Sequence, residues 1–190
     1  MVPSRPPSIE PTDPRLLAEP LDFLEAEHYR QRAALAHLER VRAEASPERR
    51  ASLARLVLDF VINDVAAHVA DEEGDLFPLL RRRCPESDGI ERVLALVSAE
   101  HGRDRDLAAP VAEGLALCAR REAPGEGFAA AVAAFVDSQR RHLAWENAFV
   151  LPLARKRLTR HDRRRLAAAM AARRGLRRAR PAVRAGYFGK

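Results

Sequence analysis

The chain has 190 residues, of which 47% are hydrophobic, and a net charge of +6, which is enough for one domain with a sizeable core and extensions at its ends. No apolar run approaches the roughly 18 residues of a membrane span, and no apolar leader follows Met1, so we expect neither a spanning helix nor a secretory signal. The two cysteines, Cys84 and Cys118, match no metal-binding spacing and support no disulfide framework, so we expect a cytoplasmic protein.

The N-terminal residues 1–20 contain six prolines in a polar setting, which predicts an extended or disordered arm without chemistry of its own. A first helix is predicted from about residue 21 to 45, because its apolar residues recur every three or four positions. This inward-facing stripe consists of Leu21, Leu24, His28, Gln31, Leu35 and Leu38. His28 lies within the stripe, whereas His37 lies outside it and is predicted to be solvated.

A second helix is predicted to begin at Ser46, an N-cap residue followed by Pro47 at the first helical position. Its inward face carries Val57, Val61, Val65, His68 and Glu72. Gly74 and Pro78 are expected to bend or break this helix after Glu72.

Two further helices follow, and each has one histidine in its apolar stripe. The third begins near Ile90, carries His101, and is expected to kink at Pro110. The fourth begins near Phe128 and ends or kinks near Pro152. Its inward face carries Phe128, Phe135, His142, Glu146 and Phe149, with Trp145 on the flank.

The C-terminal part is strongly basic. Residues 155–190 contain 14 lysines and arginines against one acid, whereas residues 1–154 contain 19 basic and 26 acidic residues. A capping box at Thr159–Asp162 predicts a short helix that ends near Arg174. We favour a solvated helix and a disordered end. The alternative is a site for an anionic partner, such as nucleic acid, an anionic membrane surface or an acidic protein.

One sequence motif occurs twice: a histidine, a glutamate four residues later, and a proline six residues after the glutamate. The copies are His68 to Pro78 and His142 to Pro152. A lone histidine precedes each, since His28 lies 40 residues before His68 and His101 lies 41 before His142. This spacing predicts two helical hairpins that form an all-α, up-down-up-down four-helix bundle over residues 21–157. Residues 1–20 form the arm and residues 158–190 the basic helix and tail.

These histidines and glutamates predict a metal site. One histidine in an apolar stripe is usually a core residue with a hydrogen-bond partner, and one histidine–glutamate pair arises easily by chance. Four buried imidazoles and two carboxylates, however, would be costly without a bound cation. Residues four apart project from one helical face, and imidazole with carboxylate suits first-row transition metals. We expect a pair of metal ions bound by His28, His68, Glu72, His101, His142 and Glu146.

The same six residues, in this order on separate predicted helices, resemble the hemerythrin-like (HHE cation-binding) family over roughly residues 20–157. The matching segments are Glu27-His28, His68 to Pro78, Glu100-His101 and His142 to Glu146. The resemblance implies a non-haem di-iron site in which Glu72 and Glu146 bridge the irons. It places His28 and His68 on one iron and His101 and His142 on the other. Zinc or manganese are expected substitutes.

Two positions differ from the oxygen-carrying members of that family. Arg105 stands one turn after His101, where those members have another histidine. Glu146 follows His142 by four residues, where they have an aspartate five residues on. The chain therefore resembles a variant with four histidines and two glutamates.

Residues next to the predicted ligands are assigned separately. Glu27, Glu73 and Glu100 could accept hydrogen bonds from ligand imidazoles. We favour surface acids instead, because helical geometry turns them away from the inward stripe. Asp64, one turn before His68, is the better candidate for a hydrogen bond to a ligand imidazole. The aromatic residues predicted to pack in the core are Phe60, Phe135, Trp145 and Phe149.

Three functions fit this pattern. The first is a di-iron protein that binds or senses oxygen, nitric oxide or peroxide, or handles iron. The second is a di-iron oxidoreductase or peroxidase that uses the same ligands. The third is a nucleic-acid- or anion-binding scaffold that acts through the basic tail. We favour the first, because the sequence identifies no acid, base or substrate pocket beyond the metal ligands, and therefore expect a binding protein rather than an enzyme.

Overall fold

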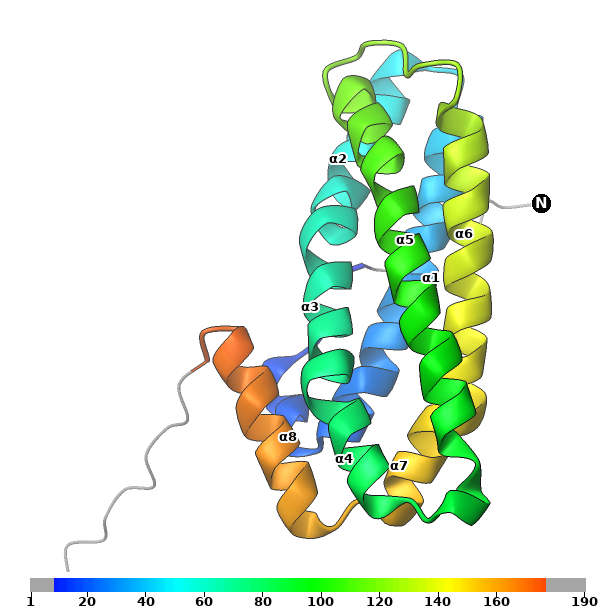
Figure 1. The fold of residues 1–190 in the computed structure, drawn as a ribbon. Helices are drawn as coiled ribbons and strands as arrows, with labels where there is room; N and C mark the ends of the chain where they lie inside the picture. The colour runs from blue at the N-terminus through cyan, green and yellow to red at the C-terminus, as the bar shows by residue number, and fades with distance from the viewer. Residues whose placement is uncertain (1–8, 177–190) are drawn as a thin grey trace, which may run out of the picture.

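A computed structural model describes residues 9–176, and within that range every regular element is helical. The long elements run side by side (Figure 1). Helix α1 (Pro20–Ala43) packs against α2 (Pro47–Asp59) and α6 (Phe128–Trp145), and α5 (Ile90–Ala119) packs against the same two helices on the other side. The predicted all-helical bundle is thereby confirmed. No helix in the described part of the chain is long and apolar enough to cross a membrane.

The first helix, α1, spans Pro20–Ala43, close to the predicted range. Proline suits its first turn, since the missing N–H has no partner there in any helix. His28 is fully buried, as expected for a residue of the inward stripe. The prediction for His37 was wrong, because its side chain is also buried. A helix packed against two neighbours buries more than one stripe of its surface.

The second long segment runs without a break from Pro47 to Arg83. Its parts are α2 (Pro47–Asp59), η2 (Phe60–Asp64), α3 (Val65–Asp71), η3 (Glu72–Leu76) and α4 (Phe77–Arg83). The Ser46 hydroxyl accepts from the Arg49 N–H and caps its start. The helix was predicted to bend or break at Gly74 and Pro78. It does not break, but passes through a π-helical turn, η3, in which the Phe77 N–H bonds to the Glu72 carbonyl. Pro78 has no N–H to donate, and the wider turn lets the helix continue around it.

The other hairpin has the same construction. Helix α5 spans Ile90–Ala119 and continues through Pro110. Helix α6 (Phe128–Trp145) leads into the π-helical turn η5 (Glu146–Val150) and then α7 (Leu151–Arg157). In each copy of the repeated motif, the glutamate is therefore the first residue of a π-helical turn, and the proline lies two residues after the end of that turn. The short element η4 (Glu86–Asp88) lies in the connection between the hairpins.

The N-terminal arm is more ordered than predicted. A 3₁₀ helix, η1, spans Pro14–Ala18, with the Asp13 carboxylate accepting from the Arg15 N–H. Ile9 and Leu17 are both buried against the bundle. The prediction of a disordered arm is therefore wrong for this part, and residues 1–8 lie outside the described range.

The basic helix also packs more closely than predicted. Helix α8 spans Arg160–Arg173 and lies against η1, α1 and α3 (Figure 1). Leu166 and Met170 are buried, since they lie four residues apart on one face among the arginines. The helix does have a solvated face, on which Arg160, Arg164 and Arg165 are exposed, but its opposite face packs against the bundle. The predicted disordered end and the anion-binding tail fall largely on residues 177–190, outside the described range.

The first prediction concerns Asp162, which anchors the start of α8. Its carboxylate is 1% exposed, accepts from the Arg83 guanidinium at 2.8 and 3.1 Å, and completes the capping box with Thr159. Arg83, and after it Thr159, hold the pKa of Asp162 well below its usual range despite the burial. Asp162→Asn should therefore lower stability at pH 7 by about 2 kcal/mol, because charge-assisted hydrogen bonds are lost.

The pH dependence gives the check. A depressed carboxyl pKa stabilises the fold fully above the ordinary aspartate pKa of about 4, and the effect is lost as pH falls through the folded-state value. The difference in melting temperature between Asp162→Asn and the original protein should be about 6 °C at pH 7 and shrink in acid. Asp137→Asn, an exposed aspartate in α6, serves as the control. A difference that stayed constant with pH would contradict this account.

Candidate metal centre

All six sequence-predicted ligands meet in the middle of the bundle, in two groups that share both glutamates. The first group is His28, His68, Glu72 and Glu146, and the second is Glu72, His101, His142 and Glu146. In each group the potential ligand atoms lie within 4.8 Å of one another, and all six side chains are buried. These six side chains form a polar layer between the two apolar clusters of the core.

Every long segment of the bundle contributes to the centre. His28 comes from α1, His68 from α3, His101 from α5 and His142 from α6. Glu72 and Glu146 open the π-helical turns η3 and η5. A π-helical turn widens the helix at that point, and turns of this type are frequent at functional sites.

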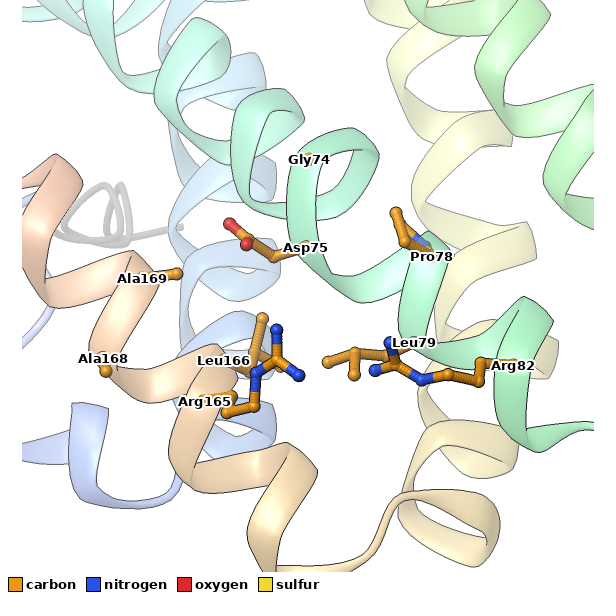
Figure 2. A pocket seen from close by; sticks show the side chains of 9 residues that line it. All are labelled: Gly74, Asp75, Pro78, Leu79, Arg82, Arg165, Leu166, Ala168 and Ala169. Carbon is orange, nitrogen blue, oxygen red and sulfur yellow. The ribbon is translucent and has the colours of Figure 1, made fainter.

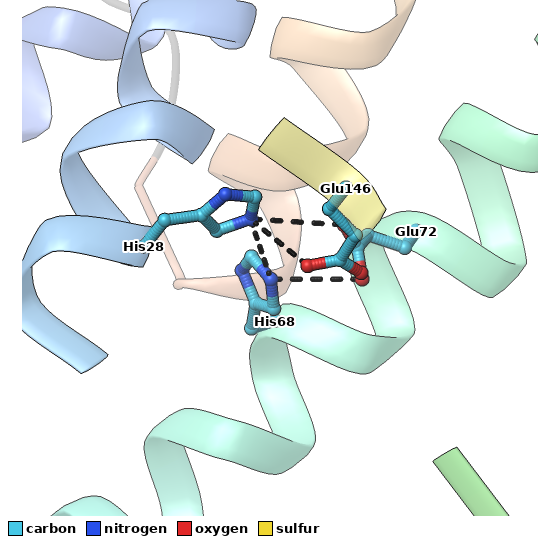
Figure 3. A group of neighbouring side chains, drawn as sticks. All are labelled: His28, His68, Glu72 and Glu146. Carbon is cyan, nitrogen blue, oxygen red and sulfur yellow. Dashed lines mark hydrogen bonds and ion pairs between the residues drawn. The ribbon is translucent and has the colours of Figure 1, made fainter. Parts of the chain in front are cut away.

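In the first group, the histidine nitrogens converge on the carboxylates (Figure 3). The Nε2 atoms of His28 and His68 lie 3.2 Å apart. His28 Nε2 lies 3.3 Å from Glu146 Oε2 and 4.0 Å from Glu72 Oε1, and His68 Nε2 lies 3.5 Å from Glu72 Oε2. Four candidate ligand atoms therefore surround one small volume.

The second group repeats this arrangement on the other side of the two glutamates. His142 Nε2 lies 2.7 Å from Glu146 Oε1, and His101 Nε2 lies 3.4 Å from Glu72 Oε2 and 4.0 Å from Glu146 Oε1. Each glutamate thus approaches histidines of both groups. A carboxylate has two oxygens and can serve two cations, whereas an imidazole nitrogen serves one.

The hydrogen bonding of the centre fits a bound metal. Both oxygens of Glu72 and of Glu146, together with His101 Nε2, are buried without a hydrogen bond of acceptable geometry. Buried carboxylate oxygens are normally paired, since an unpaired one loses its hydration without compensation. These orphaned atoms face the shared volume, and nitrogen and oxygen donors of this kind suit iron, zinc or manganese. The residues present therefore fit a pair of such ions.

The negative charges of Glu72 and Glu146 favour the protonated form of two neighbouring histidines. Burial opposes the charged form of His68, but the Glu72 and Glu146 carboxylates outweigh it and raise the pKa of His68 to about 9. The pKa of His142 is raised to about 9 in the same way, chiefly by Glu146. Burial lowers the pKa of His28 to about 4, and burial together with the Glu146 charge raises the pKa of Glu72. The protein without metal thus holds protons where a cation would otherwise balance the carboxylates.

The acids around the ligands were partly mispredicted. Glu73 is not a plain surface acid, because its Oε1 accepts from His101 Nδ1 at 2.6 Å. Glu100 is buried, with Oε2 3.6 Å from His142 Nδ1, and Glu27 is also buried, with an oxygen 3.7 Å from Arg30. Asp64, predicted to support a ligand, instead pairs with Arg30 at 2.7 Å.

Asn147 is a partner that the sequence reading missed. Its side-chain oxygen lies 3.2 Å from His28 Nδ1, and its amide donates to the Leu143 carbonyl. Together, Asn147 and Glu73 orient two of the four imidazoles with Nε2 toward the shared volume. Partners of this type commonly fix the tautomer and direction of ligand histidines. The sequence did offer a signal for this role, because Asn147 directly follows the predicted ligand Glu146.

The aromatic residues divide into two kinds. Phe60 and Phe135 are buried as predicted. Phe77, not predicted, stacks on the His101 ring at a centroid distance of 6.0 Å. The prediction for the other two was wrong, because Trp145 is 37% exposed and Phe149 49%.

A hollow of about 370 Å³ reaches the centre from the side, between the α2–α3 segment and α5. Most of its lining is aliphatic, including Val61, Val65 and Val69, and His101 lies at its inner end. Arg105 also lines it but is exposed at the surface, so its guanidinium, which has no lone pair to offer a metal, is not part of the buried ligand set. A small, weakly polar molecule could approach His101 by this route.

Comparison with known proteins gives one family. A family model described as "Hemerythrin HHE cation binding domain" matches residues 19–154. No curated protein and no solved structure matches the chain at a significant level.

Proposed function

Because the chain belongs to the hemerythrin HHE cation-binding domain family, we propose that it is a non-haem di-iron protein that binds or senses a small ligand such as oxygen, nitric oxide or peroxide, or handles iron. The observation that carries the proposal is the pair of buried ligand groups that share Glu72 and Glu146, whose four oxygens lack hydrogen bonds. The proposal includes an up-down-up-down bundle over residues 21–157, preceded by an arm and followed by a basic helix and tail.

In this proposal the two glutamates hold both cations and each histidine holds one. His28 and His68 serve the first position, and His101 and His142 the second. A pair of bound irons would supply redox chemistry and an exchangeable coordination position. His28 Nδ1 donates to the Asn147 side-chain oxygen and His101 Nδ1 donates to the Glu73 carboxylate, which would leave both Nε2 lone pairs free for the ions.

The surroundings of the site favour a small, uncharged ligand. Leu76, Phe77 and Leu143 are buried around the polar layer and exclude bulk water. The aliphatic hollow ends at His101, so the second position is the more accessible of the two. The Arg105 guanidinium at its outer part would also attract an anion such as azide, which makes azide a useful probe.

The test is metal content combined with spectroscopy. Protein purified without oxygen from iron-replete cells should contain about two irons per chain, as expected for a centre with two ligand groups. Its absorption spectrum should change on exposure to oxygen, and azide should perturb the spectrum of the oxidised form. Zinc or manganese at the same stoichiometry would keep the centre but change its chemistry. Only traces of transition metal would refute the proposal.

A further inference from the structure

A buried carboxylate lies next to the metal centre but does not belong to it. Asp71 precedes Glu72, ends α3, and is 0% exposed. Its carboxylate pairs with Arg173, the last residue of α8, and with Arg174, the residue that follows, and not with any of the six candidate ligands. Its Oδ1 accepts from the Arg173 guanidinium, and its Oδ2 accepts from Arg174 at 2.6 Å.

The Arg173 side chain contacts acids on both sides of Glu72 in the π-helical turn η3. Besides Asp71, it donates to Asp75 Oδ2 at 2.7 Å. Asp71 and Asp75 lie on the two sides of Glu72 in sequence, close enough along the helix for one guanidinium to reach both. Two carboxylates so placed would repel each other. One arginine of α8 therefore neutralises both the acid just before η3 and an acid within it.

Arg174 connects the same point to a third segment. Its guanidinium lies over the Phe23 ring of α1, 4.7 Å from the ring centroid, while it donates to Asp71. A cation over an aromatic face is attracted by the ring. Since α1 also provides His28, Arg174 links the segment that carries His28 to the one that carries His68 and Glu72.

Elsewhere α8 meets the bundle less closely. A hollow of about 370 Å³ lies between α8 and the η3–α4 segment. Arg165 lines it on one side and Arg82 on the other (Figure 2). The polar contacts of α8 thus concentrate at its two ends, Asp162 with Arg83 at one and Arg173 and Arg174 at the other. The second end lies at the ligand turn.

Within residues 9–176, no arginine pairs with the equivalent positions of the second repeated motif, His142 to Pro152. Trp145 and Phe149 occupy the positions that correspond to Asp71 and Asp75, and their rings lie 5.2 Å apart, partly exposed. Helix α8 begins at Arg160, beyond residue 154 where the family match ends. The α8 side of this contact therefore lies outside the residues that match the family model.

We propose that Arg173 and Arg174 are positioning residues that hold the Glu72 turn in its metal-binding geometry by neutralising Asp71 and Asp75. The proposal deepens the function proposed above and depends on it for the identity of the ions. Without the two arginines, the buried Asp71 carboxylate has no cationic partner and must reach water, which displaces the start of η3. Glu72, the next residue, would then move away from both ligand groups.

The test compares Arg173→Gln/Arg174→Gln with the original chain in two measurements. Metal should be lost to a chelator about tenfold faster from the double variant, the lower end of the effect expected for residues that orient ligands. In the metal-free protein, amide hydrogen exchange should accelerate in residues 68–76 and stay unchanged in α6. Adding Asp71→Asn should restore both towards the original values, because no buried charge is then left unpaired.

Arg164→Gln/Arg165→Gln is the matched control. It removes the same charge from the same helix, at exposed positions for which no ion pair is recorded within residues 9–176. The control should leave both measurements unchanged. Unchanged values in Arg173→Gln/Arg174→Gln, or equally faster exchange in α6 and residues 68–76, would overturn the proposal. Absence of metal from the original chain would instead refute the di-iron function, and hydrogen exchange would still test the positioning role.

Discussion

Replacing Glu72 with glutamine should reduce the metal content from about two ions per chain to less than one, because one carboxylate serves both halves of a two-metal site. The Oε2 atom of Glu72 lies 3.5 Å from His68 Nε2 and 3.4 Å from His101 Nε2, which belong to different ligand groups. Glutamine keeps the volume and removes the charge, so no cavity confuses the result. His68→Gln should mainly affect one ion, since His68 belongs to only one group.

The adjacent acid provides a matched control. Glu73→Gln makes the same chemical change one residue further along, at a side chain that contacts the outer nitrogen of His101 rather than the shared volume. It should keep both ions and weaken their binding by about tenfold at most, the lower part of the range for such partners. Metal analysis of the purified proteins decides the matter. Equal metal content in Glu72→Gln and Glu73→Gln would show that Glu72 is not a shared ligand.

The inward positions of the four histidines could be predicted from sequence for a simple reason. A residue spaced three or four positions from leucines and valines on a long helix must share their environment. His28, His68, His101 and His142 all satisfy this condition, and the structure buries all four. The all-helical fold follows from the same periodicity, whereas the family was indicated by the resemblance of the ordered histidines and glutamates. Both are confirmed.

The flanks of the helices could not be predicted by the same rule. Glu27 and Glu100 lie one position from a ligand histidine, about 100° around the helix, and the rule assigns them to the surface. Both are buried, because each helix packs against two neighbours and the interior extends beyond one stripe. Conversely, Trp145 and Phe149 are hydrophobic but partly exposed, since nothing within the described range covers that flank of α6 and η5.

The π-helical turns could be predicted in part from the sequence, whereas the packing of α8 could not. Pro78 and Pro152 follow their glutamates at the same distance, so the repeat did indicate a backbone irregularity, although not that the helix continues through it. Helix α8 shows few apolar residues among many arginines, which is typical of a solvated helix. Its docking depends on Asp71, a buried acid about 100 residues earlier, and no local pattern links the two.

Removing the metal ions should lower the melting temperature of the original chain by about 10 °C. A ligand present at about 1,000 times its dissociation constant stabilises the folded state by about 4 kcal/mol, and each kcal/mol is worth about 2–4 °C in a domain of this size. Metal removal also leaves the Glu72 and Glu146 carboxylates facing each other in the core. Protons on His68 and His142, whose pKa values are raised to about 9, compensate for part of this repulsion. The metal-free protein should therefore remain folded at neutral pH, with a looser centre.

Differential scanning calorimetry before and after chelation, at neutral pH and with and without added ferrous iron, measures the effect. Glu72→Gln/Glu146→Gln is the control, because it keeps the bundle and removes both shared ligands. Its melting temperature should not respond to chelator or to iron. The change in the original chain should also reverse when iron is restored, since two hydrophobic clusters outside the metal centre also hold the bundle together. Equal melting temperatures of the metal-free and iron-loaded original protein would place the metal outside the core, and the buried histidines and glutamates would then need another explanation.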